Sequence, residues 1–155
     1  MFYLITAVML FVFFVIIFVI AQLMKNNGIV DIAWGTGFVL GAAASWLLGQ
    51  PQGTVPLVIT LLIAIWGLRL TFYLARRNLG AAEDFRYAKM RRDWAGKTFY
   101  LRMFVQIYLL QLVLNYLINL PAIVRNLEDL RNWNWIVSIG LFIWLIGFFF
   151  ESVGD

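Results

Sequence analysis

Apolar and polar positions alternate in long blocks along this chain. Five apolar runs, separated by short polar segments, cover residues 2–23, 30–48, 55–75, 99–120 and 133–152. A helix needs about 20 mostly apolar residues to cross a bilayer, and in hydrocarbon the backbone polar groups must be satisfied within the element itself. The pattern therefore predicts an all-α, polytopic membrane helix bundle with five transmembrane helices.

The composition supports this fold class. Of the 155 residues, 63% are hydrophobic and 13% are charged, whereas soluble domains carry about 25% charged residues. The lipid bilayer must therefore solvate much of the surface, and we expect residues 1–155 to form a single transmembrane domain. No basic residue precedes Lys25, so the first run is predicted to be a retained helix and not a signal peptide.

The chain contains neither cysteine nor histidine. Disulfides and thiolate chemistry are therefore excluded, and the commonest general base and metal ligand is missing. We expect no metal site. Any chemistry must use acids, tyrosines, basic side chains or a cofactor.

Basic residues are concentrated in the loop 76–98, which holds seven of the twelve lysines and arginines. With Lys25 this gives eight bases on one side of the membrane, against Arg125 and Arg131 on the other. The positive-inside rule then predicts an amino terminus outside and a cytoplasmic loop 76–98 in a multi-pass membrane protein. Because the rule explains these bases, no nucleic-acid partner is expected.

The third run carries Trp66, Arg69, Tyr73 and Arg76 on one helical face. Arginine is the preferred planar clamp for phosphate, so this stripe is one candidate for binding a phosphate-bearing ligand. The alternative is that Arg69 snorkels to the headgroups and that Tyr73 belongs to an interfacial belt.

Asp31 lies near the cytoplasmic start of the second run, three residues before Trp34. A carboxylate at a helix amino terminus interacts favourably with the helix dipole, while acids within a membrane are usually functional. Both interpretations are open. Glu151 and Asp155, four residues apart at the end of the fifth run, are predicted to pair with arginines of the loop 76–98.

Two further stripes predict contacts between helices. Small residues of the second run recur every fourth position, at Ala33, Gly37, Gly41 and Ser45, which permits close approach, predicted here to the first or the third run. Amides of the fourth run recur in the same way, at Gln111, Asn115 and Asn119. We expect these amides to form hydrogen bonds between helices.

Four segments occur in an order that is similar to a known family: Asn27-Gly-Ile-Val-Asp31, Trp66-Gly-Leu-Arg69, Glu83-Asp-Phe-Arg-Tyr87 and Glu151-Ser-Val-Gly-Asp155. Together they resemble the bacterial DUF1295 membrane proteins, which are placed with the steroid 5-alpha-reductase superfamily. The resemblance implies a seven-helix membrane fold, an NADPH cofactor in a cytoplasm-facing cavity, and reduction of a carbon–carbon double bond next to a carbonyl in a lipid.

The resemblance also assigns roles. Arg69, Tyr73 and Asp155 match family positions that bind the cofactor, and we add Arg76 from the same helical face. Asp31 falls near the acid that polarises the substrate and is our catalytic candidate. Trp34 and Trp66 are expected to contact a lipid or sterol-like substrate. The family places a tyrosine that works with the acid near the position of Trp66.

Five helices out of an implied seven lead us to expect an amino-terminal part of a longer protein, inactive by itself. Two other functions remain open. Isoprenylcysteine methyltransferases have a related architecture and would use S-adenosylmethionine instead of NADPH. A non-enzymatic helix bundle could bind anionic lipid headgroups through the basic loop 76–98.

Overall fold

The computed structural model describes residues 1–94, 96, 98–128 and 133–154, and within them the regular elements are helices. In chain order they are α1 (Phe2–Leu23), α2 (Ile29–Gly49), α3 (Thr54–Asn78), α4 (Phe85–Asp93), α5 (Phe99–Met103), η1 (Phe104–Leu109), α6 (Leu110–Leu127) and α7 (Trp135–Gly154). Five helical segments of this described part are long and apolar enough to cross a membrane, with α5, η1 and α6 forming one of them. The predicted fold class is confirmed.

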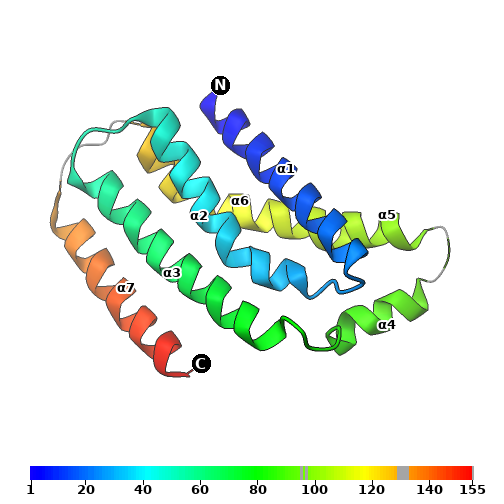
Figure 1. The fold of residues 1–155 in the computed structure, drawn as a ribbon. Helices are drawn as coiled ribbons and strands as arrows, with labels where there is room; N and C mark the ends of the chain where they lie inside the picture. The colour runs from blue at the N-terminus through cyan, green and yellow to red at the C-terminus, as the bar shows by residue number, and fades with distance from the viewer. Residues whose placement is uncertain (95, 97, 129–132, 155) are drawn as a thin grey trace.

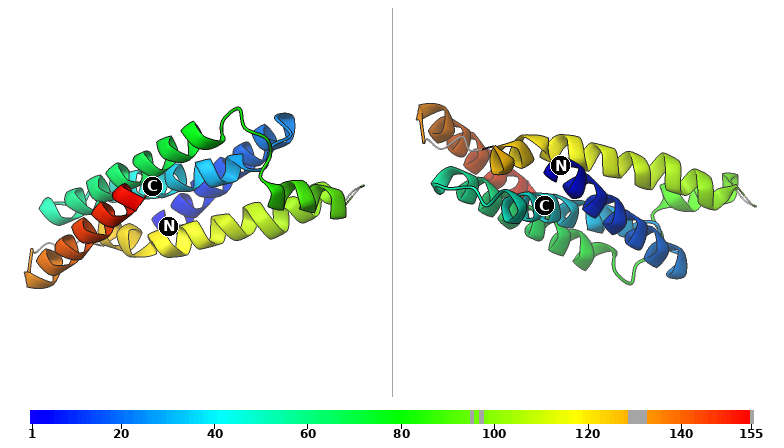
Figure 2. Two further views of the ribbon diagram at one scale, coloured as in Figure 1. Left: turned by 90° about the horizontal axis from the view of Figure 1, so that it is seen from below. Right: turned by 90° about the horizontal axis from the view of Figure 1, so that it is seen from above.

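Helix α2 is the centre of the bundle. Helices α1, α3 and α6 all pack on it, and α3 and α6 lie on two different sides of it (Figures 1 and 2). The contact with α3 is close because glycine faces glycine: a Cβ at Gly67 would approach the carbonyl oxygen of Gly35 to 2.7 Å. Small residues at such a crossing let two membrane helices approach at backbone distance.

The small stripe of α2 packs mainly on α6, which was not predicted, and its Gly41 also faces Leu10 of α1, one of the two spans that were predicted. A Cβ at Gly37 would meet Asn115 Nδ2 at 2.9 Å, and one at Gly41 would collide with Asn119 Nδ2. Three asparagines of α6 donate to backbone carbonyl oxygens of α2, in the pairs Asn115–Trp34, Asn119–Phe38 and Asn126–Ala42, at 3.0, 3.0 and 3.1 Å. The amides of Asn115 and Asn119 require glycine opposite them because only glycine leaves room for the amide group. The predicted hydrogen bonding between helices is thus confirmed for Asn115 and Asn119.

The fourth span differs from its predicted shape. It was expected to end at residue 120, before Pro121, but α6 continues to Leu127 with the proline inside it. Proline is tolerated within membrane helices because neighbouring groups satisfy the freed backbone atoms. Near its start the span contains the π-helical turn η1, which inserts an extra residue into the helical repeat. Tyr108 of η1 is fully buried.

The basic loop 76–98 contains a helix. Helix α3 runs on to Asn78, and after a short turn α4 begins at Phe85. Asp84 caps α4, since its Oδ1 accepts a hydrogen bond from the backbone N–H of Arg86 at 2.9 Å. Tyr87 of α4 belongs to the main hydrophobic core, which gathers the adjoining ends of α1, α2, α5 and η1. The loop therefore folds back under the bundle.

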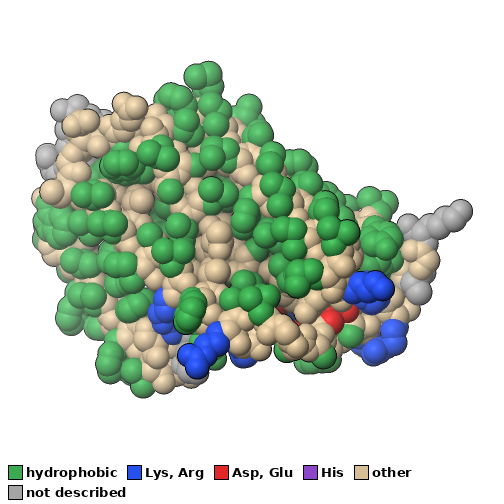
Figure 3. All heavy atoms as spheres, viewed as in Figure 1, with side chains coloured by type: hydrophobic (Ala, Val, Ile, Leu, Met, Phe, Trp, Pro, Cys, Tyr) green, Lys and Arg blue, Asp and Glu red, His purple; other side chains and the backbone are tan. Residues whose placement is uncertain are grey.

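Helix α7 forms the edge of the bundle, beside α3 (Figures 1 and 2). None of its residues is buried. Most of the surface seen in Figure 3 is hydrophobic, whereas lysines and arginines gather along one margin, by α4 and the carboxyl end of α3. An apolar surface with a basic margin is what a bilayer and its headgroup layer require.

Candidate functional site

The segments Asn27–Asp31 and Glu83–Tyr87 meet in space, although 56 residues separate them. Asn27 contacts Glu83, and four residues further along both segments Asp31 contacts Tyr87. The equal spacing arises because α2 and α4 each advance about one turn in four residues. We call these residues, together with Arg91, the interfacial cluster.

Glu83 is the most heavily bonded carboxylate of the interfacial cluster. Its Oε1 accepts from the backbone and side-chain nitrogens of Asn27, at 2.8 and 2.9 Å, and from Arg91 Nη2 at 2.9 Å. Its Oε2 accepts from Arg91 Nε at 3.0 Å, which completes a two-point contact between guanidinium and carboxylate. Burial opposes ionisation of Glu83, but the hydrogen bonds from Arg91 and Asn27 outweigh it and lower the pKa of the carboxyl.

Asn27 joins four elements at this point. It is fully buried, and its Oδ1 accepts from Gln22 Nε2 of α1 at 2.8 Å and from the Tyr108 hydroxyl of η1 at 3.2 Å. Through Glu83 it is also tied to the segment before α4. This network fixes the entry of α2, and with it the position of Asp31 one turn later.

Asp31 is held by a tyrosine that sequence reasoning did not assign to it. Its Oδ1 accepts from the Tyr87 hydroxyl at 2.8 Å, and its Oδ2 lies 3.5 Å from Arg86 Nη2. Arg86 bonds Asp84 at shorter distances, 2.9 and 3.2 Å. Burial and the neighbouring Asp31 carboxylate raise the pKa of Tyr87 far above its ordinary value, so this hydroxyl remains a donor. The motif around Tyr87 was visible in the sequence, but its partner was not.

An apolar groove runs along α2 between α3 and α6. One cleft of about 280 Å³ is lined by Val30, Asp31, Trp34, Leu70, Leu74 and Gln111. Another, of about 330 Å³, is lined by Phe38, Ile59, Ile63, Trp66, Ile118, Asn119, Pro121 and Ala122. Positions 31, 34 and 38 succeed one another along α2, so the two clefts follow each other along one groove. The carboxyl of Asp31, with its side chain 26% exposed, stands at the end of the groove that is nearest to α4.

Aromatic side chains line this groove in a row. The ring of Phe38 makes edge-to-face contacts with Trp34 and with Trp66, at 5.4 and 5.2 Å between ring centroids. Such contacts fix the rings more firmly than burial alone. Asp31 and Trp34, predicted to serve the same substrate, therefore lie in one cleft, and Trp66 lies in the next.

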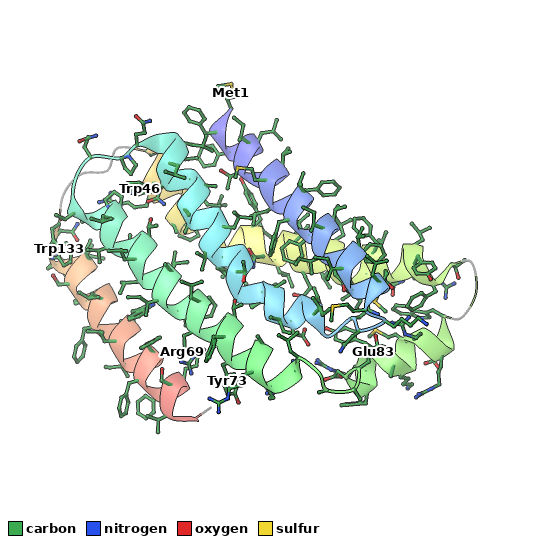
Figure 4. All side chains as sticks on the ribbon, viewed as in Figure 1. Met1, Trp46, Arg69, Tyr73, Glu83 and Trp133 are labelled. Carbon is green, nitrogen blue, oxygen red and sulfur yellow. The ribbon has the colours of Figure 1, made fainter. Side chains whose placement is uncertain are left out.

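Glu151 is bound by Arg69 and Trp66 of α3. It was predicted to pair with arginines of the loop 76–98, and that prediction is wrong. Trp66 Nε1 lies 2.9 and 3.1 Å from the two carboxylate oxygens, and Arg69 donates at 3.1 Å to both the carboxylate and the backbone carbonyl of Glu151. The prediction failed because α7 runs along α3 and brings the acid beside its middle turns. Figure 4 shows Arg69 and Tyr73 on the α7 side of α3.

Arg76, a further predicted cofactor residue, lies at the carboxyl end of α3. Arg76 is exposed, and the guanidinium of Arg77 stacks over the ring of Tyr73 at 5.6 Å. Beside them is a polar cleft of about 260 Å³ lined by Asn26, Gly28, Arg77, Asn78, Ala82 and Asp84. Asp155 lies outside the described residues. The predicted sites thus fall on two faces of α3, with the groove on one face and Arg69 and Tyr73 on the other.

Residues 17–155 match the protein family described as "Protein of unknown function (DUF1295)". No curated protein and no solved structure matches the chain.

Proposed function

The chain belongs to the DUF1295 family, and on that premise we propose that it forms part of a membrane oxidoreductase whose full-length form uses NADPH to reduce a carbon–carbon double bond next to a carbonyl in a lipid. The observation that carries this proposal is the Asp31–Tyr87 pair at the end of the apolar groove nearest to α4. A bilayer lipid can enter such a groove sideways, with its reactive carbonyl at the carboxyl group.

The chemical role of Asp31 follows from its two oxygens. Tyr87 occupies Oδ1 at 2.8 Å, while Oδ2 has only a long contact of 3.5 Å with Arg86. In its protonated form Asp31 would donate from Oδ2 to the carbonyl oxygen of the lipid and withdraw electrons from the conjugated double bond. The β carbon would then be electrophilic enough to accept the hydride, and the α carbon of the resulting enolate would take up a proton from water. Tyr87 acts on Asp31 and is a positioning residue.

The cofactor would bind at the cytoplasmic end of α3. Tyr73, Arg76 and Arg77 supply the phenolic and cationic donors that suit a phosphate. Arg69 could join them only by exchanging its bonds to Glu151, because a carboxylate and a phosphate at one guanidinium repel each other. When bound, NADPH would supply the hydride.

The enzymatic proposal also implies an orientation. NADPH is a cytoplasmic cofactor, and the positive-inside rule assigns the basic residues of α4 to the cytoplasmic side. We therefore place α4 at the cytoplasmic face of a bacterial inner membrane and the amino terminus outside. A reactive tag at Gly80 should be shielded from reagents applied to intact cells, and a tag at Gly53 should be labelled.

One further function has an observation in its favour. Lys89 and Arg92 of α4 are exposed at the basic margin, next to exposed Arg76 and Arg77. Such a margin attracts anionic headgroups, at about 1 kcal/mol for each base near the surface. In that case the protein would bind lipid without chemistry.

The test uses the protein in lipid nanodiscs with NADPH and a long-chain enone. We expect NADPH to bind, and Asp31→Asn to slow reduction in a single turnover by roughly 10² to 10⁴, the usual contribution of a positioned acid, with NADPH affinity unchanged. Tyr100→Phe, which alters an exposed tyrosine, is the control.

Binding of S-adenosylmethionine in place of NADPH would identify a methyltransferase instead. Binding of anionic lipid alone, with neither cofactor, would support the non-enzymatic function. Reduction that is indifferent to Asp31→Asn would remove this residue from the mechanism.

A further inference from the structure

Helix α4 turns one of its two faces toward the bundle. Tyr87 on this face is buried and bonds Asp31, and Arg91 pairs with Glu83. The face is completed by two side chains that pack against the hydrophobic core, at the three- and four-residue spacing of one side of a helix: Met90 and Trp94. Helix α4 is therefore the element that keeps the hydroxyl of Tyr87 against Asp31.

The opposite side of α4 is exposed. It carries Phe85, Lys89 and Arg92, which follow one another at intervals of four and three residues, and we call these three residues the outer face of α4. Phe85 is 78% exposed, and both bases are exposed as well. Neither base forms a salt bridge with a carboxylate of the described residues. The outer face thus combines an apolar ring with two cations whose charge no acid of this part of the chain balances.

The outer face lies where the protein surface changes from apolar to basic. Helix α4 extends from the carboxyl end of α3 at one end of the bundle (Figure 1), and lysines and arginines gather along the same margin (Figure 3). With nine residues it is too short to span a bilayer. Leu79, between α3 and α4, is 57% exposed. A short helix with exposed bases and exposed apolar side chains suits the depth of the lipid headgroups.

The sign of the charge selects the class of ligand. Besides the two bases of the outer face, Arg76 and Arg77 are exposed at the carboxyl end of α3, whereas Asp93 is an exposed acid at the end of α4. A surface with this excess of bases attracts the phosphate groups of anionic lipids. An acidic protein would also suit the bases, but Phe85 favours lipid, because the headgroup boundary offers hydrocarbon to an apolar ring.

We propose that the outer face of α4 docks on anionic phospholipids of the surrounding membrane and thereby holds Tyr87 against Asp31. A helix of nine residues is marginally stable by itself. Contacts with lipid on one face of α4 therefore add to the side-chain contacts that seat its other face on the bundle. Neither set of contacts involves a cofactor or a substrate, so the docking is independent of whether the protein is an enzyme.

Hydrogen exchange measures how firmly α4 is seated. The wild-type protein is compared in nanodiscs of phosphatidylcholine alone and of phosphatidylcholine mixed with phosphatidylglycerol, without cofactor or substrate. We expect the protection of the α4 amides to rise by up to roughly 25-fold in the anionic nanodiscs, because each of the two bases contributes about fivefold near a charged membrane surface. Protection of residues 27–31, which Glu83 and Tyr87 hold, should rise with it. High salt should abolish the increase, since it screens exposed charges.

A matched pair of arginine variants locates the contact. Arg92→Gln on the outer face should reduce the increase about fivefold, whereas Arg125→Gln, the same change at the opposite end of the bundle, should leave it intact. Lys89→Gln should act as Arg92→Gln does, and the double variant should lose the increase. Each variant is judged by its own difference between the two lipids, so a change in the intrinsic stability of α4 cancels.

Four results would overturn the proposal. Equal protection of wild-type α4 in both lipids would mean that no docking occurs. An increase that Arg92→Gln and Arg125→Gln reduce equally would arise from the charge of the whole protein. An increase confined to α4, with residues 27–31 unchanged, would remove the link to Asp31. Protection of α4 by poly-glutamate, but not by phosphatidylglycerol, would identify an acidic protein as the partner of the outer face.

Discussion

The interfacial cluster and the contact between α3 and α7 are both built on a carboxylate paired with an arginine, yet they differ in how they are supported. Glu83 of the cluster is only 11% exposed and receives four hydrogen bonds from two residues. Glu151 of α7 is 36% exposed and holds a helix that has no buried residue. The same pair of functional groups therefore holds the interfacial cluster rigidly, whereas it joins α7 to α3 through a partly exposed contact.

The difference matters because a buried pair must keep every partner, whereas an exposed one can exchange them. Losing one member of a buried, hydrogen-bonded pair leaves uncompensated polar groups. A half-exposed pair is screened by water and contributes little. We therefore regard the cluster as the fixed frame of Asp31 and the α7 contact as the place where a ligand could compete for Arg69.

The largest expected effect comes from removing the cluster carboxylate. Glu83→Ala leaves Arg91 and both nitrogens of Asn27 without their acceptor, and should destabilise the protein by about 3 kcal/mol. Denaturant unfolding in detergent micelles measures it. Asp93→Ala, which alters an exposed acid at the end of α4, is the control and should change little. A loss for Glu83→Ala no larger than that of the control would remove the contrast between the two regions.

Overpacking tests the same contrast along the helices. Gly41→Leu places a side chain where Asn119 Nδ2 already lies, and should cost about 1–3 kcal/mol. Gly140→Leu on α7 is the matched change, because a Cβ there meets no atom within 4 Å. In thermal unfolding, Gly41→Leu should lower the melting temperature clearly more than Gly140→Leu. Equal melting temperatures would mean that the α2–α6 contact is as loose as the surroundings of α7.

A pH titration of stability should show a smaller effect, which arises from Glu83. The pKa of Glu83 is lower in the folded than in the unfolded protein, so its stabilisation is full above the ordinary glutamate pKa of about 4.3 and is lost as the pH falls through the folded value. The difference in unfolding free energy between wild type and Glu83→Gln should therefore shrink between about pH 5 and pH 3. A difference that stays constant over this range would contradict the assignment.

The smallest effect is expected at α7. Glu151→Gln keeps the size of the side chain and removes a partly exposed ion pair, so the unfolding free energy should fall by less than about 1 kcal/mol. Hydrogen exchange should nevertheless increase along α7, because no buried residue holds it. If exchange in α7 is unchanged, the helix is held by contacts other than Arg69 and Trp66.

The sequence by itself determined the spans. Hydrophobic runs of sufficient length require helices in a bilayer, so the fold class and the number of long apolar helices followed from composition and length alone. It also singled out Asp31 as a catalytic candidate, because a carboxylate next to an apolar run is rare, and that role stays a prediction. The amide stripe of α6 was predictable for the same reason, since polar groups in a membrane span need partners.

Only the tertiary structure decided which residues meet. The Asp31–Tyr87 pair depends on the turn that folds α4 back under α2, and the Arg69–Glu151 pair depends on α7 lying beside α3. Helical periodicity gives the face of a helix and says nothing of the neighbour that covers it. Local rules failed in the same way at Pro121, where a residue that usually ends a helix is kept inside one because its surroundings satisfy the backbone.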